Sequence, residues 1–479
     1  GTHVYHQGRD GARDALVDPY TGMAYVVRDF DGTNGSWDQL RGRDGTGAGK
    51  KQVLVWPVNI RRDSYGNIIA RDKITTFRAA LAGNGEEAYL TGSWRSEAGE
   101  ESHRESTLSR NAQRQNLNDE VRRQYMRYPE FLSEGGIIGF VAPSFGCATE
   151  PYKTAFGMTI KRFEKEGYTV ELGPNCYEDK GIGISNTPQE CGKELTQMYE
   201  SNVNDVLISC GGGELMCEIL PYLDFDRIKA AKPKWYLGYS DNTNFTFLQN
   251  TIADTASVYG PCAGAFAMKD WHQALVDTFD VLRGKGCENN NGVVEKHVHG
   301  YDTWERESLK NEENPAPQYN LTEKKILRKY VGENECDTEI AFEGRLVGGC
   351  MDCLVNLTGT SFDKVKEFNE RYADDGIIWF LESCDLNVFA IRRAMWQMDN
   401  AGWFKNVKGF LIGRPLCYGQ EMMGLDQYRA VTGIAAKYNV PVIMDCDFGH
   451  LSPSMPIVSG AYTQVKVKDN DLSLNYRFC

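Results

Sequence analysis

The sequence has no hydrophobic run long enough to cross a bilayer and no excess of positive charge. A membrane-spanning helix needs about 20 consecutive apolar residues. The formal net charge of −13 at pH 7 argues against the basic face that nucleic acids and anionic membranes require. The opening residues also lack the pattern of a signal peptide. We therefore expect a cytoplasmic protein whose partner is a peptide or an aminoacyl small molecule, with no nucleic acid and no membrane.

Cysteine is missing from the first 146 residues, although the chain has 14. Residues 1–118 also contain 13 Arg and 3 Lys, whereas residues 121–479 contain 15 Arg and 22 Lys. This change in composition predicts a separate module over 1–118, of unknown role. Turn residues flank stretches of strand character at 23–30 and 52–60, so the module leans toward β structure. The polar run 93–120 is typical of a linker or an exposed helix.

The sequence also lacks a phosphate-binding loop and a zinc motif. The glycine-rich stretch 45–50 has Asp44 where the first glycine of such a loop should stand, and Lys51 replaces the magnesium-binding Ser or Thr. Cys350 and Cys353 form the only C-x-x-C motif, and no second pair follows at zinc spacing. The scattered cysteines are typical of buried, reduced thiols. We expect neither a cofactor nor a metal.

From residue 135 onward, strand, loop and helix patterns alternate. The expected strands are 137–142, 169–172 and 205–210, and the expected helices are 154–166 and 214–220. Strands that alternate with helices favour the α/β class, with an open and mostly parallel sheet. We therefore predict an amino-terminal α/β domain over 119–285.

A long surface excursion is predicted at 286–340, where the alternation stops and polar residues dominate. Loops of this length between domains often carry lids or specificity contacts. His297 and His299 lie here without a carboxylate or cysteine at ligand spacing, so we interpret them as surface histidines. The alternation then resumes, which predicts a carboxy-terminal α/β domain over 341–479.

A buried strand that turns sharply and presents a serine is predicted at 234–243. Gly238 allows a tight backbone, Ser240 follows two residues later, and a helix begins near residue 244. In a nucleophile elbow this arrangement exposes the serine, and the amide of the next residue, here Asp241, faces an oxyanion. The stretch departs from G-x-S-x-G at its last position. A serine that caps the following helix is therefore the alternative.

Two further apolar strands end beside candidate partners for this serine. Glu382 follows the strand 376–381, and His450 follows the strand 440–444, with one more strand expected at 407–412. A serine hydroxyl needs a base such as neutral histidine, and the histidine needs a carboxylate on its other nitrogen. Glu382 is our preferred acceptor because a carboxylate at the end of a buried strand needs a partner. Asp385 is the competing acceptor.

The glycine turn 211–213, which follows the strand 205–210, is a candidate anion-binding loop. A strand, glycines and a helix start in this order expose amide hydrogens to an anion. A plain tight turn explains the same residues.

The order of these motifs resembles the LD-carboxypeptidase family of serine peptidases, which includes murein tetrapeptide carboxypeptidases and microcin C immunity peptidases. The resemblance covers residues from about 135 to 479. It rests on Ala142-Pro143-Ser144, Ser209-Cys210-Gly211-Gly212-Gly213, Gly238-Tyr239-Ser240-Asp241-Asn242-Thr243, Gly260-Pro261, Gly344-Arg345-Leu346-Val347-Gly348-Gly349, Leu357-Thr358-Gly359-Thr360, Leu381-Glu382 and Phe448-Gly449-His450.

The resemblance implies roles for particular residues. It makes Ser240 the nucleophile, His450 the general base and Glu382 the residue that orients it. It also implies an oxyanion hole formed by Asp241 and Gly212. We further expect substrate contacts from Ser144, Gly211, Gly213 and Trp304.

The resemblance also implies an activity and an assembly. We expect a homodimer that hydrolyses an amide bond next to a terminal carboxylate or an acidic residue, without cofactor or metal. A microcin C-type immunity peptidase that cleaves aminoacyl-nucleotide analogues is one alternative. A non-catalytic binding protein on the same scaffold is another.

Overall fold

The computed structural model describes residues 126–478, together with six short strands between residues 14 and 90. The chain divides into two compact units, Gly1–Asn111 and Ala112–Cys479. In the first unit the described strands form three antiparallel pairs: β1 (Asp14–Val17) with β2 (Ala24–Val27), β3 (Arg61–Arg62) with β4 (Ile68–Ile69), and β5 (Phe77–Ala80) with β6 (Glu87–Leu90). β2 lies within the strand predicted at 23–30. The predicted strand 52–60 and the polar run 93–120 lie outside the described residues.

The first sheet of the second unit is the predicted open parallel sheet. Its six strands, in spatial order, are β24 (Ile457–Ser459), β11 (Ser257–Tyr259), β10 (Trp235–Gly238), β9 (Val206–Ser209), β7 (Ile137–Val141) and β8 (Thr169–Leu172). All neighbouring pairs are parallel except β11 with β24, which is antiparallel. β24 comes from the far end of the chain, so the carboxy-terminal part completes the amino-terminal sheet.

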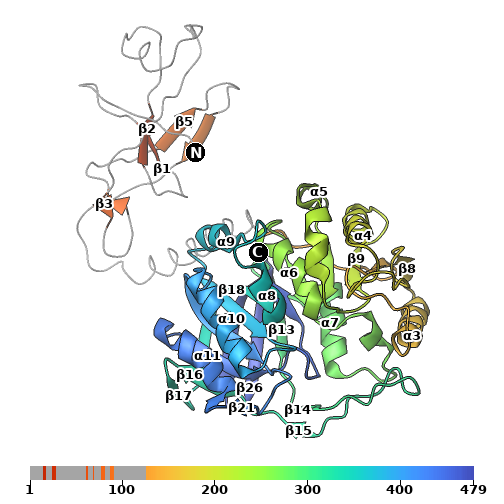
Figure 1. The fold of residues 1–479 in the computed structure, drawn as a ribbon. Coiled ribbons are helices and arrows are strands. Elements are labelled where there is room, and N and C mark those ends of the chain that lie inside the picture. Colours follow the sequence, from red (N-terminus) through yellow and green to blue (C-terminus); the bar gives the residue numbers. More distant parts are fainter. Residues whose placement is uncertain are drawn as a thin grey trace, which may run out of the picture. The chain divides into compact units, whose positions relative to one another are not determined.

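Helices flank the strands of this sheet, as the alternation predicts (Figure 1). The α-helices of this part are α3 (Tyr152–Lys165), α4 (Pro188–Glu200), α5 (Phe225–Ala230), α6 (Thr243–Thr251) and α7 (Gln273–Arg283), and the 3-10 helices are η1 (Met216–Tyr222), η2 (Ser240–Asn242) and η3 (Ala263–Ala267). β9 and β10 are fully buried, which explains their uninterrupted apolar sequences. None of the described helices combines the length and apolar character that crossing a bilayer would need.

The second sheet is mixed, with a parallel centre and antiparallel arms. Its ten strands, in spatial order, are β12 (Glu288–Asn290), β13 (Val293–His299), β26 (Asp471–Phe478), β25 (Tyr462–Lys468), β18 (Ile340–Cys350), β19 (Ile377–Glu382), β20 (Val407–Gly413), β23 (Pro441–Cys446), β16 (Arg328–Val331) and β17 (Asn334–Glu335). The strands β18, β19, β20 and β23 run parallel. The three predicted strands at 376–381, 407–412 and 440–444 coincide with β19, β20 and β23.

The carboxy-terminal helices complete this α/β part. They are α8 (Met351–Leu357), α9 (Val365–Arg371), α10 (Val388–Asn400), α11 (Gln427–Ala435) and the 3-10 helix η4 (Ala436–Tyr438). α10 packs against both α8 and α11 (Figure 1). The hairpin of β21 (Glu421–Met422) and β22 (Leu425–Asp426) lies between α10 and α11 in the sequence.

The segment 286–340 is more than the surface excursion predicted from its polarity. β13 pairs with β26, and β16 pairs with β23, so both ends of the segment join the large sheet. At the end of β13 the exposed His297 and His299 alternate with the buried Val298, which suits an antiparallel strand with one buried face. The middle of the segment holds only a small hairpin, β14 (Thr303–Trp304) with β15 (Glu323–Lys324).

Helix α6 joins the two sheets. All nine of its residues are buried, and it contacts β10 and β11 of the first sheet and β18 of the second. The backbone N–H of Cys350, at the end of β18, donates to Thr243 Oγ1 at 3.0 Å. A Cβ on Gly349 would lie 2.6 Å from Thr243 Cγ2, so only glycine lets β18 approach the helix start this closely.

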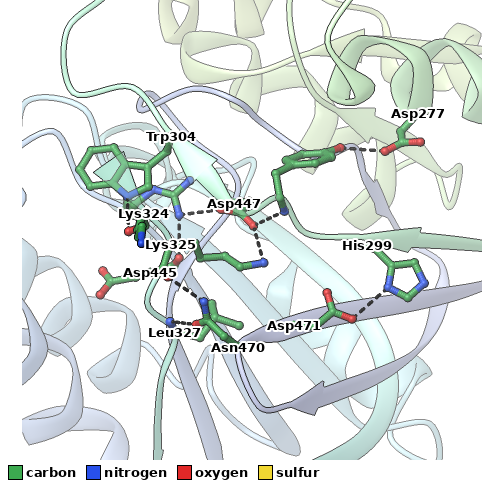
Figure 2. A network of polar contacts seen from close by, with 12 residues as sticks. Asp277, His299, Trp304, Lys324, Lys325, Leu327, Asp445, Asp447, Asn470 and Asp471 are labelled. Carbon is green, nitrogen blue, oxygen red and sulfur yellow. Dashed lines mark hydrogen bonds and ion pairs between the residues drawn. The ribbon is translucent and has the colours of Figure 1, made fainter. Parts of the chain in front are cut away.

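A buried polar network fixes the segment that follows β23. The Asp447 carboxylate lies 2.7 Å from Arg414 Nη1 and 3.4 Å from Lys325 Nζ, and all three side chains are almost fully buried. It also accepts a hydrogen bond from the backbone N–H of Tyr301 at 2.8 Å. Figure 2 shows Asp447 at the centre of this network, with Lys325 directed toward it. The network ties the 286–340 segment to the chain three residues before His450.

Glycine is required where β18 lies against β19. A Cβ on Gly348 would fall well inside van der Waals contact with the carbonyl oxygen of Phe380, and Gly348 has φ +155°. The exchange Gly348→Ala should therefore lower the free energy of unfolding by about 2–4 kcal/mol, from overpacking and backbone strain. The control Gly157→Ala, in α3 with open space around its Cβ, should raise it by about 0.5–1 kcal/mol. Urea unfolding measures both, and equal stability of the two variants would contradict the packing argument.

Candidate active site

Ser240 sits on a sharp turn between a buried strand and a buried helix. β10 ends at Gly238, and Tyr239 is extended. Ser240 is the first residue of η2 and has φ +63°, and α6 follows from Thr243. A left-handed conformation costs a non-glycine residue about 1–2 kcal/mol, so the surrounding contacts must hold it. The turn presents the serine side chain at the carboxyl end of the strand, as the elbow interpretation predicts.

Asn242 is the residue that braces this turn. Its side-chain nitrogen donates to the carbonyl oxygens of Gly211 at 2.8 Å and Tyr239 at 3.1 Å. Its side-chain oxygen accepts from the Tyr236 hydroxyl at 2.5 Å. A Cβ on Gly238 would lie 2.9 Å from Asn242 Cβ, so the glycine leaves room for this brace. The strained backbone is thereby stabilised by buried hydrogen bonds.

The structure brings Ser240, His450 and Glu382 into one hydrogen-bonded chain. Ser240 Oγ and His450 Nε2 are 2.8 Å apart, and His450 Nδ1 and Glu382 Oε2 are 2.7 Å apart. Glu382 ends β19 and is fully buried, whereas His450 follows β23. A Cβ on Gly449, which has φ +107°, would lie 2.9 Å from Glu382 Oε2, so the histidine loop passes directly over the carboxylate.

The two charged groups of this chain shift each other's pKa. Burial alone would raise the pKa of Glu382, but the neighbouring His450 and the hydrogen bonds from His450 and Tyr259 bring it below the ordinary value. Burial would lower the pKa of His450, and the facing Glu382 carboxylate outweighs this and raises it well above 6.5. The carboxylate thus stabilises the imidazolium form of His450.

Tyr259 is a site residue that the sequence interpretation missed. Its hydroxyl donates to Glu382 Oε1 at 2.5 Å and accepts the backbone N–H of Ser240 at 3.0 Å. It ends β11, which lies beside β10 in register with Gly238. The sequence does show a tyrosine at the end of an apolar strand. It does not show that this strand lies beside the one that ends at Gly238, and without that strand order Tyr259 could not be assigned to the site.

The glycine turn faces the serine. A Cβ on Gly212 would lie 3.2 Å from Ser240 Cβ and 3.3 Å from Ser240 Oγ, so the turn runs along the side chain of the serine. The carbonyl of Gly212 accepts the amide of Phe145 at 2.9 Å, and the carbonyl of Gly211 accepts from Asn242. Both carbonyls are therefore held by the protein. This fixes the peptide units beside Ser240.

Two predicted substrate contacts lie elsewhere. Ser144 is fully buried and donates to Asp241 Oδ2 at 2.5 Å, behind the elbow. Trp304 is buried, and the Arg414 and Arg306 guanidinium groups stand 5.1 and 5.4 Å from its ring centre. Neither residue is among those that line the two cavities described below. Ser144 therefore supports the elbow through Asp241, and Trp304 packs against two arginine side chains.

The structure also decides between the alternative interpretations of single residues. Of the two acidic residues considered as the partner of His450, Glu382 faces the histidine ring, whereas Asp385 is exposed. The residue that precedes α6 is Asn242, so Ser240 does not cap this helix. His297 and His299 are exposed, and His299 Nδ1 lies 3.0 Å from Asp471 (Figure 2).

Two cavities flank the serine and histidine. The larger, of about 440 Å3, is lined by Gly211, Gly212, Tyr239 and His450, and by residues 305–319 of the middle segment, among them Arg306 and Lys310. The smaller, of about 200 Å3, is lined by Ser240 itself, Gly212, Gly213 and His450, and by the ends of β18 and β19. The described residues contain no group of three or more His, Cys, Asp or Glu side chains suited to hold a metal ion.

The chain matches models of a known peptidase family over both sheets. Residues 138–260 match the LD-carboxypeptidase N-terminal domain, and residues 343–465 match the LD-carboxypeptidase C-terminal domain. Residues 1–74 match a domain of unknown function. This separate domain match lies within the amino-terminal module 1–118 that composition predicts.

Individual relatives agree with this match. The microcin C7 self-immunity protein of Escherichia coli is 24% identical over 357 residues, which is 72% of this chain and 95% of that protein. A structure of the microcin C7 self-immunity protein in complex with aspartyl sulfamoyl adenosine has a TM-score of 0.57 at 20% identity, covering 72% of this chain and 98% of that one. Muramoyltetrapeptide carboxypeptidase from Oxalobacter formigenes has a TM-score of 0.51 at 19% identity, covering 71% and 98%.

The family matches fall on the two α/β parts in their order along the chain, and the solved relatives share the fold. The resemblance inferred from the motifs is therefore confirmed. The chain belongs to the LD-carboxypeptidase family of serine peptidases.

Proposed function

We propose that this enzyme hydrolyses an amide bond next to a terminal carboxylate through a Ser240–His450–Glu382 triad. The observation that carries the proposal is the unbroken chain from Ser240 Oγ through the His450 ring to the buried Glu382 carboxylate. A serine that served only as a binding group would not need a base on its hydroxyl and a buried acid behind that base. This geometry disfavours the non-catalytic alternative.

The reaction follows from these positions. Ser240 Oγ attacks the amide carbonyl and passes its proton to His450 Nε2, and Glu382 stabilises the resulting imidazolium. The backbone N–H groups of Asp241 and Gly212 stabilise the oxyanion of the tetrahedral intermediate. His450 then returns the proton to the leaving amine as the C–N bond breaks. A water molecule, activated by His450, hydrolyses the acyl-enzyme and restores Ser240.

The larger cavity supports recognition of an anionic leaving group. The Lys310 ammonium lies 4.8 Å from the centre of the Tyr152 ring, and burial lowers its pKa. Arg306 lines the same cavity, and so does Glu305, whose carboxylate accepts the backbone N–H of Asn320 at 2.7 Å. A buried ammonium gains from a carboxylate partner, so we assign the carboxylate of the departing residue to this cavity. The carboxylate would be that of a carboxy-terminal amino acid.

The second candidate is an immunity peptidase that cleaves aminoacyl-nucleotide analogues. It is favoured by the likeness to the microcin C7 self-immunity protein, whose structure holds aspartyl sulfamoyl adenosine. The two candidates differ in the leaving group that the larger cavity would accept. From the family resemblance we also propose a homodimer that acts in the cytoplasm.

Loss of the nucleophile should abolish hydrolysis. The variant Ser240→Ala should release D-alanine from a murein tetrapeptide with kcat reduced by about 10^6-fold, because no other hydroxyl stands at His450 Nε2. The control Ser361→Ala removes an exposed serine that lies outside both cavities and should leave kcat unchanged. Turnover by Ser240→Ala close to that of the parent enzyme would defeat the triad.

The pH dependence should report the raised pKa of His450. Only neutral His450 can accept the proton of Ser240, so kcat/KM should rise with pH through a pKa above 6.5. The variant Glu382→Gln removes the charge that stabilises the imidazolium, so the pKa of His450 should fall. NMR titration of His450 in the Ser240→Ala and Ser240→Ala/Glu382→Gln backgrounds measures this shift. An unchanged or higher pKa in the double variant would show that Glu382 does not set it.

Lys310 should determine the preference for a free carboxylate. Its exchange to Met should raise KM for a peptide with a free carboxy terminus by about 10- to 100-fold, and change KM little for the matching carboxamide. The control Lys324→Met alters an exposed lysine outside the cavity lining and should keep the parent's preference. If Lys310→Met keeps it as well, the carboxylate is bound elsewhere.

A further inference from the structure

Four cysteines line the smaller cavity, beside the serine and the histidine. They are Cys217, Cys350, Cys353 and Cys384, and all four are free thiols. The hydrolysis assigned to Ser240 uses none of them. Thiols that border a cavity are candidates for oxidation, because the reaction needs access to the sulfur as well as the sulfur itself.

Two of these cysteines form the C-x-x-C motif, which the structure places between a strand and a helix. Cys350 ends β18, and Cys353 lies in the first turn of α8. The chain then returns through α9 to β19, which pairs in parallel with β18. A C-x-x-C pair beside a βαβ arrangement is typical of redox-active dithiols. The motif therefore has the local arrangement of a redox-active pair.

The two thiols of this pair are in contact. The Cys350 thiol donates a hydrogen bond to the sulfur of Cys353, and its own sulfur lies 3.3 Å from Asp352 Oδ2. Cysteines whose side chains point apart cannot be bridged without backbone movement, whereas a hydrogen bond between sulfurs requires side chains that point together. Asp352 is also in place to take up the proton of Cys350.

Cys353 is the more reactive thiol of the pair. The hydrogen bond from Cys350 lowers the pKa of Cys353, although burial and the nearby Asp241 outweigh it and leave this pKa above its ordinary value. Burial raises the pKa of Cys350 well above the ordinary value. Cys353 is also 9% exposed, against 1% for Cys350. A small oxidant that enters the cavity therefore meets Cys353 first.

Cys353 also contacts the elbow that carries the nucleophile. Its thiol donates to the carbonyl oxygen of Ser240 at 3.6 Å, and its sulfur lies 3.9 Å from Asp241 Oδ1. A disulfide has no S–H group, so oxidation would remove this donor and draw the sulfur toward Cys350. Ser240 has a left-handed backbone that only its contacts hold in place, so the change acts on the position of the nucleophile.

We propose that Cys350 and Cys353 are a redox modification site that hydrogen peroxide converts to a disulfide, and that the disulfide slows turnover at Ser240. The existence of the disulfide is independent of the proposed peptidase function, whereas its effect on turnover rests on that function.

The oxidation proceeds in two steps. The Cys353 thiolate attacks one peroxide oxygen, so an S–O bond forms, the O–O bond breaks and hydroxide leaves. Cys350 gives its proton to Asp352 and attacks the sulfur of the resulting sulfenic acid, so the S–S bond forms and the S–O bond breaks. The leaving oxygen departs as water. In sum, two thiols are oxidised to one disulfide, and one peroxide is reduced to two water molecules.

Mass spectrometry of the full chain after treatment with hydrogen peroxide tests the pairing directly. Free thiols are alkylated before digestion, and the tryptic peptide 346–364 contains Cys350 and Cys353 and no other cysteine. We expect this peptide to escape alkylation and to lose two hydrogen atoms, and dithiothreitol should reverse both changes. A peptide alkylated at both cysteines, or cross-linked to the peptide of Cys217 or Cys384, would overturn the proposal.

The variant Cys350→Ser tests the order of the two steps. It removes the thiol that attacks the sulfenic acid, so dimedone should trap the sulfenic acid on Cys353. Trapping on Cys217 or Cys384, with Cys353 unlabelled, would show that the oxidant reacts elsewhere in the cavity and would refute the assigned order.

The effect on turnover is measured on the same oxidised samples. Oxidation should lower kcat for release of D-alanine from a murein tetrapeptide by about tenfold, because the nucleophile is displaced, and dithiothreitol should restore it. Methionine sulfoxide is not reduced by dithiothreitol, so the recovery assigns the loss to thiols. Unchanged kcat in a fully oxidised sample would overturn the effect on Ser240.

Matched variants locate the sensitivity. Cys353→Ser should keep the kcat of its own reduced form after peroxide treatment, whereas the control Cys287→Ser, which alters a half-buried thiol outside both cavities, should stay as sensitive as the parent. Equal losses in both variants would refute the pair as the cause. If no sample hydrolyses the peptide, the proposed function fails, and the mass of peptide 346–364 still decides whether the disulfide forms.

Discussion

The structure of the site depends on one buried negative charge. Glu382 has no exposed surface, and a buried carboxylate without partners would cost several kcal/mol. Its two oxygens are taken by His450 and by the Tyr259 hydroxyl, which come from different sheets. Because Tyr259 also accepts the amide of Ser240, the carboxylate is linked to the strained elbow on one side and to the histidine loop on the other. The carboxylate that faces His450 therefore also links the two sheets beside Ser240.

The backbone around this charge is arranged to bring three chain segments close together. Gly349 lets β18 approach the start of α6, and Gly449 lets the histidine loop cross over Glu382. β18 in turn pairs in register with β19, so Cys350 lies opposite Glu382. Asp447 anchors the histidine loop through Arg414 and Lys325. The positions of Ser240, His450 and Glu382 are thus determined by buried packing, with little freedom left to the loops themselves.

Much of this architecture can be predicted from the sequence, because strands buried on both faces have uninterrupted apolar runs. β9, β19 and β23 were predictable in this way, and Ser240, Glu382 and His450 each follow such a run. Tyr259 could not be found, since its partner Glu382 is 123 residues away and the two meet only through the order of strands in the sheets. The strands within 286–340 were missed for a related reason. Their residues are largely polar, and strand pairing buries several of them, such as Glu295, Lys296 and Lys329, so composition indicates a loop where pairing makes a strand.

The two cavities beside Ser240 and His450 differ in charge, because Glu214, Asp352 and Asp385 line the smaller one, whereas Arg306 and Lys310 line the larger one together with Glu305. Charged walls act on the parts of a substrate that lie away from the reacting bond, so they can differ between relatives while the groups around Ser240 stay unchanged. Variation of the cavity walls within this fold would then alter the substrate without disturbing the buried carboxylate of Glu382.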